Sequence, residues 1–275
     1  MKPNVMTIER DVQLDRDDRE IDIQEVGICD LKQSLIWTGL EIDETAGQRV
    51  SATLSLAVSL RKEVKGIHMS RLIENLVEAN EQLGVLEMYR LLVRLKAHQE
   101  ARDAKVSISF DYYLDRQAPV SGRIAKQAYR CGYEGRLEGS RITIVQKVEV
   151  PVTTLCPCSK EISSYGAHNQ RGYVEVELEH HFTVEQELDI RIPLEEVIEA
   201  VESLASAPLY PVLKRVDERF VTMQAYDAPR FVEDMVRSVA VFLREDKRSD
   251  RWQVRVTNHE SIHQHNAFAV VSGGR

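Results

Sequence analysis

Two short segments concentrate the side chains that could do chemistry. The first, residues 154–171, holds the thiols Cys156 and Cys158 and the imidazole of His168. Thiolate and imidazole are good ligands for zinc and similar divalent ions. The cysteine spacing is not the Cys-x-x-Cys of a zinc ribbon, and no second pair exists, so a closed four-cysteine site is not expected. The segment predicts a mixed metal site with one thiolate, or alternatively a polar loop with inert thiols.

The second segment, residues 258–266, carries Glu260, His263 and His265. Paired imidazoles beside a carboxylate suit metal binding or proton transfer. If the backbone is extended, His263 and His265 share one face, and Glu260 lies on the other. A His-x-His pair is also common on ordinary polar surface. Six of the eight histidines fall at or after residue 168, which favours a site in the second half of the chain.

Other charged residues have a simpler interpretation. Residues 214–218 are predicted to link two C-terminal helices as solvated charge, and Glu233 and Asp234 lie near a helix start, where the helix dipole favours carboxylates. Ser70 is predicted to cap a helix. The chain contains no glycine-rich phosphate loop, nucleophile elbow or His-Glu-x-x-His motif, so nucleotide chemistry by a P-loop or Rossmann route is not supported.

Composition narrows the class of protein. The 275 residues are 43% apolar and 29% charged, which is ordinary for a globular protein. The net charge of −8 argues against non-specific nucleic-acid binding, although a few converging cations could still hold one triphosphate. No apolar run reaches the length of a membrane span, and the N-terminus has no apolar signal region. We therefore expect a soluble cytoplasmic protein with no membrane partner.

The elements that must position these residues follow from periodicity. Alternating apolar residues predict strands at 50–60, 106–112, 142–144, 174–178, 252–256 and 267–271. Helical spacing predicts helices at 72–77, 83–95, 194–204 and 232–243. Each half thus runs strands, two helices, strands, which favours an α+β fold with antiparallel sheets over a doubly wound parallel sheet. We expect a mobile tail at 1–20, a first unit at 21–150 and a second unit at 151–275.

Several motifs together resemble one known family. They are Leu155-Cys-Pro-Cys-Ser-Lys160, Gly166-Ala-His-Asn-Gln-Arg171, Lys65-Gly-Ile-His-Met-Ser-Arg71, Leu213-Lys-Arg-Val-Asp-Glu218, Phe231-Val-Glu-Asp-Met235 and Glu260-Ser-Ile-His-Gln-His265. In this order and over nearly the whole chain, they resemble GTP cyclohydrolase type IB, with Ile67 in place of the usual threonine. The resemblance implies the tunnelling fold, with two ββααββ units of antiparallel strands and paired helices. It also implies a homotetramer with active sites at subunit interfaces.

The resemblance further implies the reaction and the roles of residues. GTP and water would give 7,8-dihydroneopterin triphosphate and formate, with a divalent metal ion (zinc, manganese or iron(II)) as cofactor. The implied metal ligands are Cys156, His168, Glu218 and His263. The implied catalytic residues are Cys156, Glu260, His263 and His265. Glu233 would anchor the guanine base, and the candidates for the triphosphate are Lys160, Arg171, Lys214, Arg215 and Arg71.

Three alternatives stay open at this point. The related archaeal-type cyclohydrolase also opens GTP but gives a cyclic phosphate product. A non-catalytic protein of the same fold could bind a pterin or purine. A thiol redox protein could use Cys156 and Cys158. The cysteine, both histidine motifs and Glu233 argue against the binding protein, whereas product analysis would separate the two cyclohydrolases.

Overall fold

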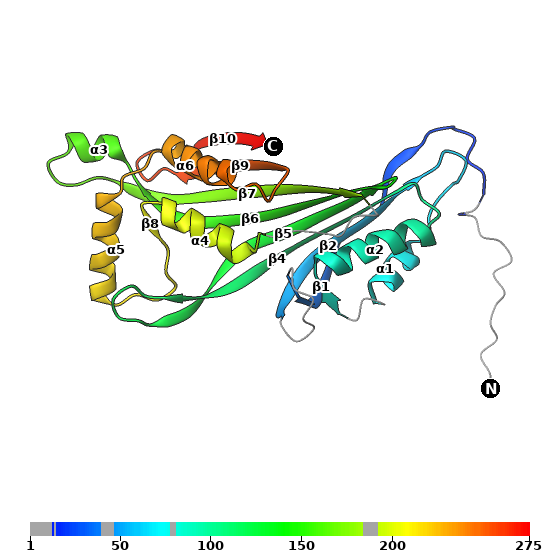
Figure 1. Ribbon diagram of the computed structural model, residues 1–275, viewed down its shortest axis with the longest axis horizontal. Helices are drawn as coiled ribbons and strands as arrows, with labels where there is room; N and C mark the ends of the chain where they lie inside the picture. Colours follow the sequence, from blue (N-terminus) through cyan, green and yellow to red (C-terminus); the bar gives the residue numbers. More distant parts are fainter. Residues whose placement is uncertain (1–12, 14, 40–46, 78–80, 184–191) are drawn as a thin grey trace.

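The strands form one long, twisted sheet in the computed structural model, which describes residues 13, 15–39, 47–77, 81–183 and 192–275 (Figure 1). Within this part of the chain ten strands share the sheet, with β8 paired to β6 and the rest in the order β10-β9-β7-β6-β5-β4-β2-β1-β3. Neighbouring strands are antiparallel except β1 and β3. The strands are β1 (Ile23–Trp37), β2 (Gln48–Leu60), β3 (Gln82–Leu83), β4 (Asp103–Gln117), β5 (Ile124–Glu138), β6 (Arg141–Leu155), β7 (Asn169–Thr183), β8 (Ala207–Pro208), β9 (Arg251–His259) and β10 (Ala267–Gly274).

Helices cover one face of this sheet. They are α1 (Met69–Val77), α2 (Val85–His98), α3 (Pro157–Ile162), α4 (Leu194–Leu204), α5 (Arg215–Asp227) and α6 (Val232–Glu245). The apolar stripes of α2, α4 and α6 pack on the sheet, and α3 and α5 stand at one end of it (Figure 1). Gly135 lets α2 approach closely, because a Cβ there would meet Leu92 Cδ1 at 2.9 Å and Met88 Sδ at 3.0 Å. No described helix is long and apolar enough to cross a membrane.

Strand β7 shows how the pattern of the sequence sets the two faces. Val174, Val176 and Leu178 are almost fully buried against the helices. Glu175 and Glu177 alternate with them and face the opposite, helix-free side. The prediction of a half-solvated antiparallel strand is therefore confirmed here. With 15 residues the strand is about 50 Å long, so its two ends belong to different regions of the molecule.

The order of strands and helices along the chain can be compared with the two units expected at residues 21–150 and 151–275. β1, β2, α1, α2, β4 and β5 precede β6, β7, α4, α6, β9 and β10, and the β5–β6 hairpin joins the two sets in one sheet. The boundary proposed between 150 and 151 falls inside β6. The proposed tail at 1–20 lies mostly outside the described residues. Of its described part, the backbone N–H of Asp17 donates to the carbonyl of Glu63 at 3.2 Å.

Some local predictions were wrong for identifiable reasons. Residues 215–227 form helix α5 rather than a link, since only Asp217 and Ala225 are buried and no apolar stripe faces the core. Ser70 lies inside the first turn of α1 instead of capping it. Strand β1 has mostly exposed side chains and therefore no clear alternation in the sequence.

A buried ion pair fixes α4 against the sheet. Arg116 Nη2 lies 2.9 Å from Glu202 Oε2, and these side chains are 14% and 9% exposed. The Tyr129 hydroxyl joins the pair, since it accepts from Arg116 Nε at 2.7 Å and donates to Glu202 Oε1 at 2.5 Å. Burial raises the pKa of Glu202, although the hydrogen bond from Tyr129 and the charge of Arg116 oppose the shift. The charge of Arg116 and the hydrogen bond from Tyr129 thus offset part of the free-energy cost of burying the Glu202 carboxylate.

Candidate functional site

The loop between β6 and β7 brings the backbones of Cys156 and His168 together. The backbone N–H of Cys156 donates to the carbonyl of His168 at 3.1 Å and so closes the loop. Cys156 is the N-cap of α3, where its Sγ accepts from the N–H of Ser159 at 3.5 Å. The Ser159 hydroxyl donates to the Cys156 carbonyl and accepts from the His168 N–H, both at 3.2 Å. The half-buried sulfur of Cys156 therefore has a fixed position, whereas Cys158 is exposed.

The His168 ring is oriented by a buried amide. Its Nδ1 lies 3.0 Å from Gln170 Oε1, and Gln170 Nε2 donates to Thr154 Oγ1 at 3.1 Å. Since the Gln170 amide nitrogen donates to Thr154, the amide oxygen faces Nδ1 of His168 and favours a proton on that ring nitrogen, so the other ring nitrogen points away from this contact. An imidazole held in this way is suited to ligate a metal through Nε2.

A third segment reaches the same place from the turn between β9 and β10. Ser261 Oγ lies 3.4 Å from His168 Nδ1, and Glu260 beside it is partly buried. His263 and His265 are exposed, and their rings stack with centroids 5.0 Å apart. Residues 261–265 form a bend rather than an extended strand, so the expected sharing of one strand face does not apply, and the two rings stack instead.

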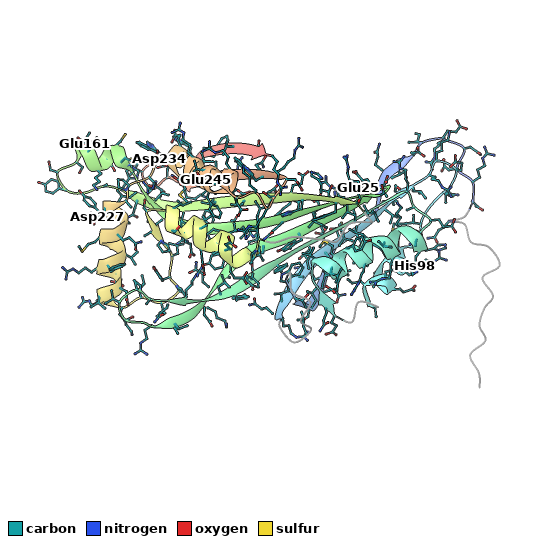
Figure 2. All side chains as sticks on the ribbon, in the orientation of Figure 1. Glu25, His98, Glu161, Asp227, Asp234 and Glu245 are labelled. Atoms are coloured by element: carbon teal, nitrogen blue, oxygen red, sulfur yellow. The ribbon has the colours of Figure 1, made fainter. Side chains whose placement is uncertain are left out.

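The start of α6 is tied to the end of β6. The backbone N–H of Arg230 donates to the carbonyl of Leu155, next to Cys156, at 2.9 Å. Glu233 therefore lies near the loop of Cys156, exposed in the first turn of α6, and it makes no hydrogen bond or ion pair with the described residues. Its neighbour Asp234 accepts from the Phe231 N–H at 2.9 Å and caps the helix. Figure 2 shows Asp234 at the same end of the molecule as Glu161 of α3.

Helix α5 joins α3 through its C-terminal end. Lys160 Nζ donates to the Tyr226 carbonyl and lies 4.3 Å from the centroid of that ring. Lys214, Arg215 and Glu218 lie at the opposite end of the helix, exposed to solvent. Glu218 is eight residues from Tyr226, or about 12 Å along the helix axis. The described chain thus does not place Glu218 beside Cys156.

Arg171 lines a cavity of about 670 Å³ between the sheet and the segment leading into α5. Lys126 and Arg130 also line it, together with Tyr173 and Tyr210. The volume lies in the range of small-molecule sites. Asp111 and Glu149 also line the cavity, and Arg130 Nη1 lies 3.9 Å from Glu149 Oε2, so the lining carries charges of both signs. Arg71 is far away, because its Nη1 donates to the His98 carbonyl at 3.4 Å, at the opposite end of the sheet (Figure 2).

A protein site for a divalent metal ion needs several Cys, His, Asp or Glu side chains around one point. Among the described residues, no group of three or more Cys, His, Asp or Glu side chains is close enough together to hold a metal ion. Cys156 and His168 nevertheless offer a fixed sulfur and an oriented ring nitrogen, which fit a borderline divalent ion. These two residues fit the implied cofactor, and its remaining ligands are not assembled within the described chain.

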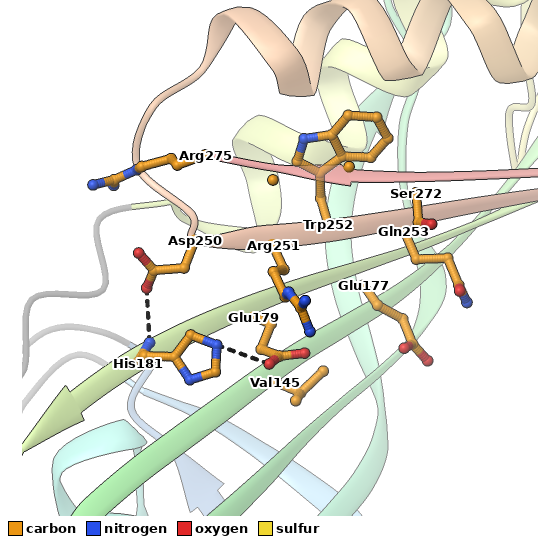
Figure 3. Close-up of a pocket in the computed structure, with 12 residues that line it drawn as sticks. Val145, Glu177, Glu179, His181, Asp250, Arg251, Trp252, Gln253, Ser272 and Arg275 are labelled. Carbon is orange, nitrogen blue, oxygen red and sulfur yellow. Dashed lines mark hydrogen bonds and ion pairs between the residues drawn. The ribbon is translucent and has the colours of Figure 1, made fainter.

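A second cavity, of about 660 Å³, lies elsewhere on the sheet (Figure 3). His181 lies in it, with Nε2 2.9 Å from Glu179 Oε1 and its backbone N–H donating to Asp250 Oδ2 at 2.8 Å. Glu179 is eight residues along β7 from Arg171, or about 26 Å. This cavity is therefore separate from the candidate site.

Asp217 was predicted to be a solvated charge, and this prediction was wrong, because the residue is fully buried. Desolvation opposes its ionisation, yet hydrogen bonds from Ser121, Lys214 and Val120 hold the pKa of Asp217 well below its usual value. Its position three residues after the helix cap is a signal that the sequence did offer. The support of His168 by Gln170 depends on strand pairing and had no such signal.

The comparisons with known proteins agree with one another. A family model described as "Type I GTP cyclohydrolase folE2" matches residues 10–269. Relatives named "GTP cyclohydrolase FolE2" include those of Magnetococcus marinus, 40% identical over 96% of both chains, and Caldicellulosiruptor saccharolyticus, 43% identical over 96% of this chain and 98% of the relative. The relative from Neisseria gonorrhoeae is 42% identical over 95% of this chain and 97% of its own.

Solved structures with a similar fold include the uricase of Arthrobacter globiformis, with a TM-score of 0.50, 9% identity and coverage of 92% of this chain and 93% of that one. The urate oxidase of Bacillus subtilis 168 has a TM-score of 0.51 and 9% identity, and covers 92% of this chain and 99% of that one. At such low identity the likeness concerns the fold alone, and it agrees with the tunnelling fold that the sequence implied.

Proposed function

The chain belongs to the family of type I GTP cyclohydrolases named FolE2, and from this premise we propose that it converts GTP and water to 7,8-dihydroneopterin triphosphate and formate, the first step of pteridine and tetrahydrofolate synthesis. The observation that carries the proposal is the backbone hydrogen bond that joins Cys156 to His168 across one loop, with Arg230, three residues before Glu233, bonded to the same strand end. A thiolate and an imidazole are suited to bind a divalent metal ion, and imidazole and carboxylate side chains are suited to transfer protons.

The proposed cofactor is a divalent ion, zinc, manganese or iron(II). Cys156 and His168 would hold it, with Glu218 and His263 as further ligands. The chemistry that this ion supplies when bound is activation of water for attack on C8 of the purine ring. The orientation of His168 by Gln170 and the hydrogen bond to the Cys156 sulfur support this assignment, because both fix ligand atoms before an ion arrives.

Glu233 would bind the base. A carboxylate accepts hydrogen bonds from guanine N1–H and the 2-amino group together, and adenine cannot reproduce this geometry. Its exposed position in a helix first turn, without a partner among the described residues, leaves both oxygens available. Glu260, His263 and His265 would carry protons to the nitrogen atoms released on ring opening, with the two stacked rings beside the turn that reaches His168.

The triphosphate would be bound by cations at this end of the chain, together with Arg71 of another copy. Arg171 already lines a cavity with other cations, and Lys160 is held over Tyr226 close to α3. The complete proposed set is Lys160, Arg171, Lys214, Arg215 and Arg71.

We also propose that the sites lie between subunits of a homotetramer. On α5, Val216, Phe220 and Met223 form an exposed apolar stripe, 54%, 47% and 52% exposed. A second stripe on α1 includes Ile73 and Val77, 39% and 72% exposed. Apolar stripes of this kind mark protein interfaces. Assembly would bring Arg71 of one copy to the α3–α5 end of another, with residues 21–150 and 151–275 as the two units of each chain.

Product analysis tests the function. Metal-stripped protein is incubated anaerobically with GTP and with manganese(II), iron(II) or zinc(II), and formate and fluorescent pterin are followed. We expect formate and a linear neopterin triphosphate with at least one metal. A cyclic phosphate product would instead identify the archaeal-type reaction. Absence of formate with every metal, from folded protein, would leave a pterin- or purine-binding protein as the better account.

A further inference from the structure

One buried carboxylate holds the first turn of α5. Asp217 Oδ1 accepts from the backbone N–H of Val120 at 2.9 Å and of Ser121 at 2.7 Å. Its Oδ2 accepts from the Ser121 hydroxyl at 2.6 Å and from the Lys214 N–H at 2.8 Å. The side chain is fully buried, so all four bonds are protected from water.

These bonds connect α5 to the hairpin between β4 and β5. Figure 1 shows this hairpin beside the first turn of α5, at the opposite end of that helix from α3. The hairpin is closed by the Ala118 N–H, which donates to the Arg123 carbonyl at 2.8 Å, and Gly122 supplies the positive φ of 67° that the turn needs. Two strands of 15 residues make it a rigid support for the helix.

The helix itself buries few side chains. Only Asp217 and Ala225 are buried in α5, and the contact with Lys160 lies at the other end. Lys214 and Glu218 are four residues apart, and the Glu218 N–H donates to the Lys214 carbonyl at 2.9 Å. Lys214, the N-cap, and Glu218 therefore both belong to the turn that Asp217 anchors.

We propose that Asp217 is a positioning residue of the cyclohydrolase, which fixes Lys214 and Glu218 in the orientation needed to bind substrate and metal. The inference rests on the proposed function of those two residues. Asp217 itself is buried and would contact neither the substrate nor the metal ion. It would act through the first turn of α5 and the β4–β5 hairpin.

The variant D217N tests the role with almost no change of volume. An amide has one acceptor oxygen, so at least one backbone N–H that now donates to Asp217 would face an N–H₂ group. S121A removes only the hydroxyl and leaves the three backbone bonds. D103N is the matched control, since Asp103 Oδ1 accepts from the Gly139 N–H at 3.2 Å on β4, at the end of that strand away from α5.

Full-length wild type and the three variants are compared at 25 °C. Circular dichroism at the same temperature shows whether each variant is folded. The measurements are kcat and KM for GTP, and divalent metal affinity by chelator competition. We expect D217N to lose about 10- to 100-fold in kcat/KM and in metal affinity, as for removal of groups that support a metal ligand. S121A should lose less, and D103N should match wild type in both quantities.

The outcomes separate the two claims. If wild type releases formate and D217N retains wild-type kcat/KM and metal affinity, the positioning role is refuted and the function stands. If D217N does not fold, S121A decides: a loss in metal affinity or kcat/KM that D103N lacks supports the role, and wild-type values refute it. If wild type releases no formate with any metal, the proposed function itself fails.

Discussion

The exposed carboxylate of Glu233 provides the sharpest prediction. Glu233→Gln keeps the size of the side chain and replaces one acceptor oxygen with a donor. Because Glu233 makes no hydrogen bond or ion pair with the described residues, the fold should lose only its interaction with the α6 dipole, about 0.3–1 kcal/mol. The thermal midpoint should therefore fall by about 4 °C or less.

The effect on GTP should be much larger. Two hydrogen bonds from guanine to a carboxylate contribute about 1.5–3 kcal/mol each, and the amide would set a donor against a donor. The amide keeps one acceptor oxygen, so one of the two bonds is lost, and about 1.5–3 kcal/mol corresponds to roughly 10- to 10²-fold in kcat/KM. Metal binding should be unchanged, since Glu233 is not among the proposed ligands.

The assay is formate release from GTP, with metal content and thermal midpoint measured on the same preparations. Asp234→Asn is the matched control, because it makes the same change of charge one residue away and its amide oxygen can still accept from the Phe231 N–H. It should retain most of the activity. Unchanged kcat/KM in Glu233→Gln would remove Glu233 from the site, and equal losses in both variants would indicate a general electrostatic effect.

Three further predictions follow from other contacts. Cys156→Ser should lose metal and at least about 100-fold in turnover, whereas Cys158→Ser, at an exposed thiol, should retain metal by elemental analysis; equal retention would contradict the assignment. Arg116→Met should destabilise the fold by about 3–5 kcal/mol in denaturant unfolding, because it leaves Glu202 buried and unpaired, and adding Glu202→Leu should restore part of that loss. Hydrogen bonds from the guanidinium of Arg248 lower the pKa of Asp246 in the folded protein. The stability that this carboxylate contributes is therefore present above its unfolded-state pKa of about 3.9, and it is lost as the pH falls through the lower folded-state value. Asp246→Asn should therefore flatten the acid side of the stability–pH curve, and an unchanged curve would refute the linkage.

The sequence by itself determined the fold class and the family. Alternation such as that of Val174, Val176 and Leu178 depends only on local geometry, so the strand could be predicted from its neighbours in the chain. The same holds for α6, whose apolar residues recur at helical spacing. The motifs around Cys156 and His168 indicated the cyclohydrolase family, because several long motifs that match one family in the same order do not arise by chance.

Only the tertiary structure decided which of those residues meet. Cys156 and His168 are joined because β6 and β7 pair in one register, and a shift by one residue would turn their side chains to opposite faces. The interior position of Asp217 depends on a hairpin almost 100 residues earlier in the chain, which no local pattern records. Arg71 lies away from the thiol because α1 packs at the other end of a sheet whose strands are about 50 Å long. Glu218 lies away from it because it is in the first turn of α5, at the end opposite the contact with Lys160.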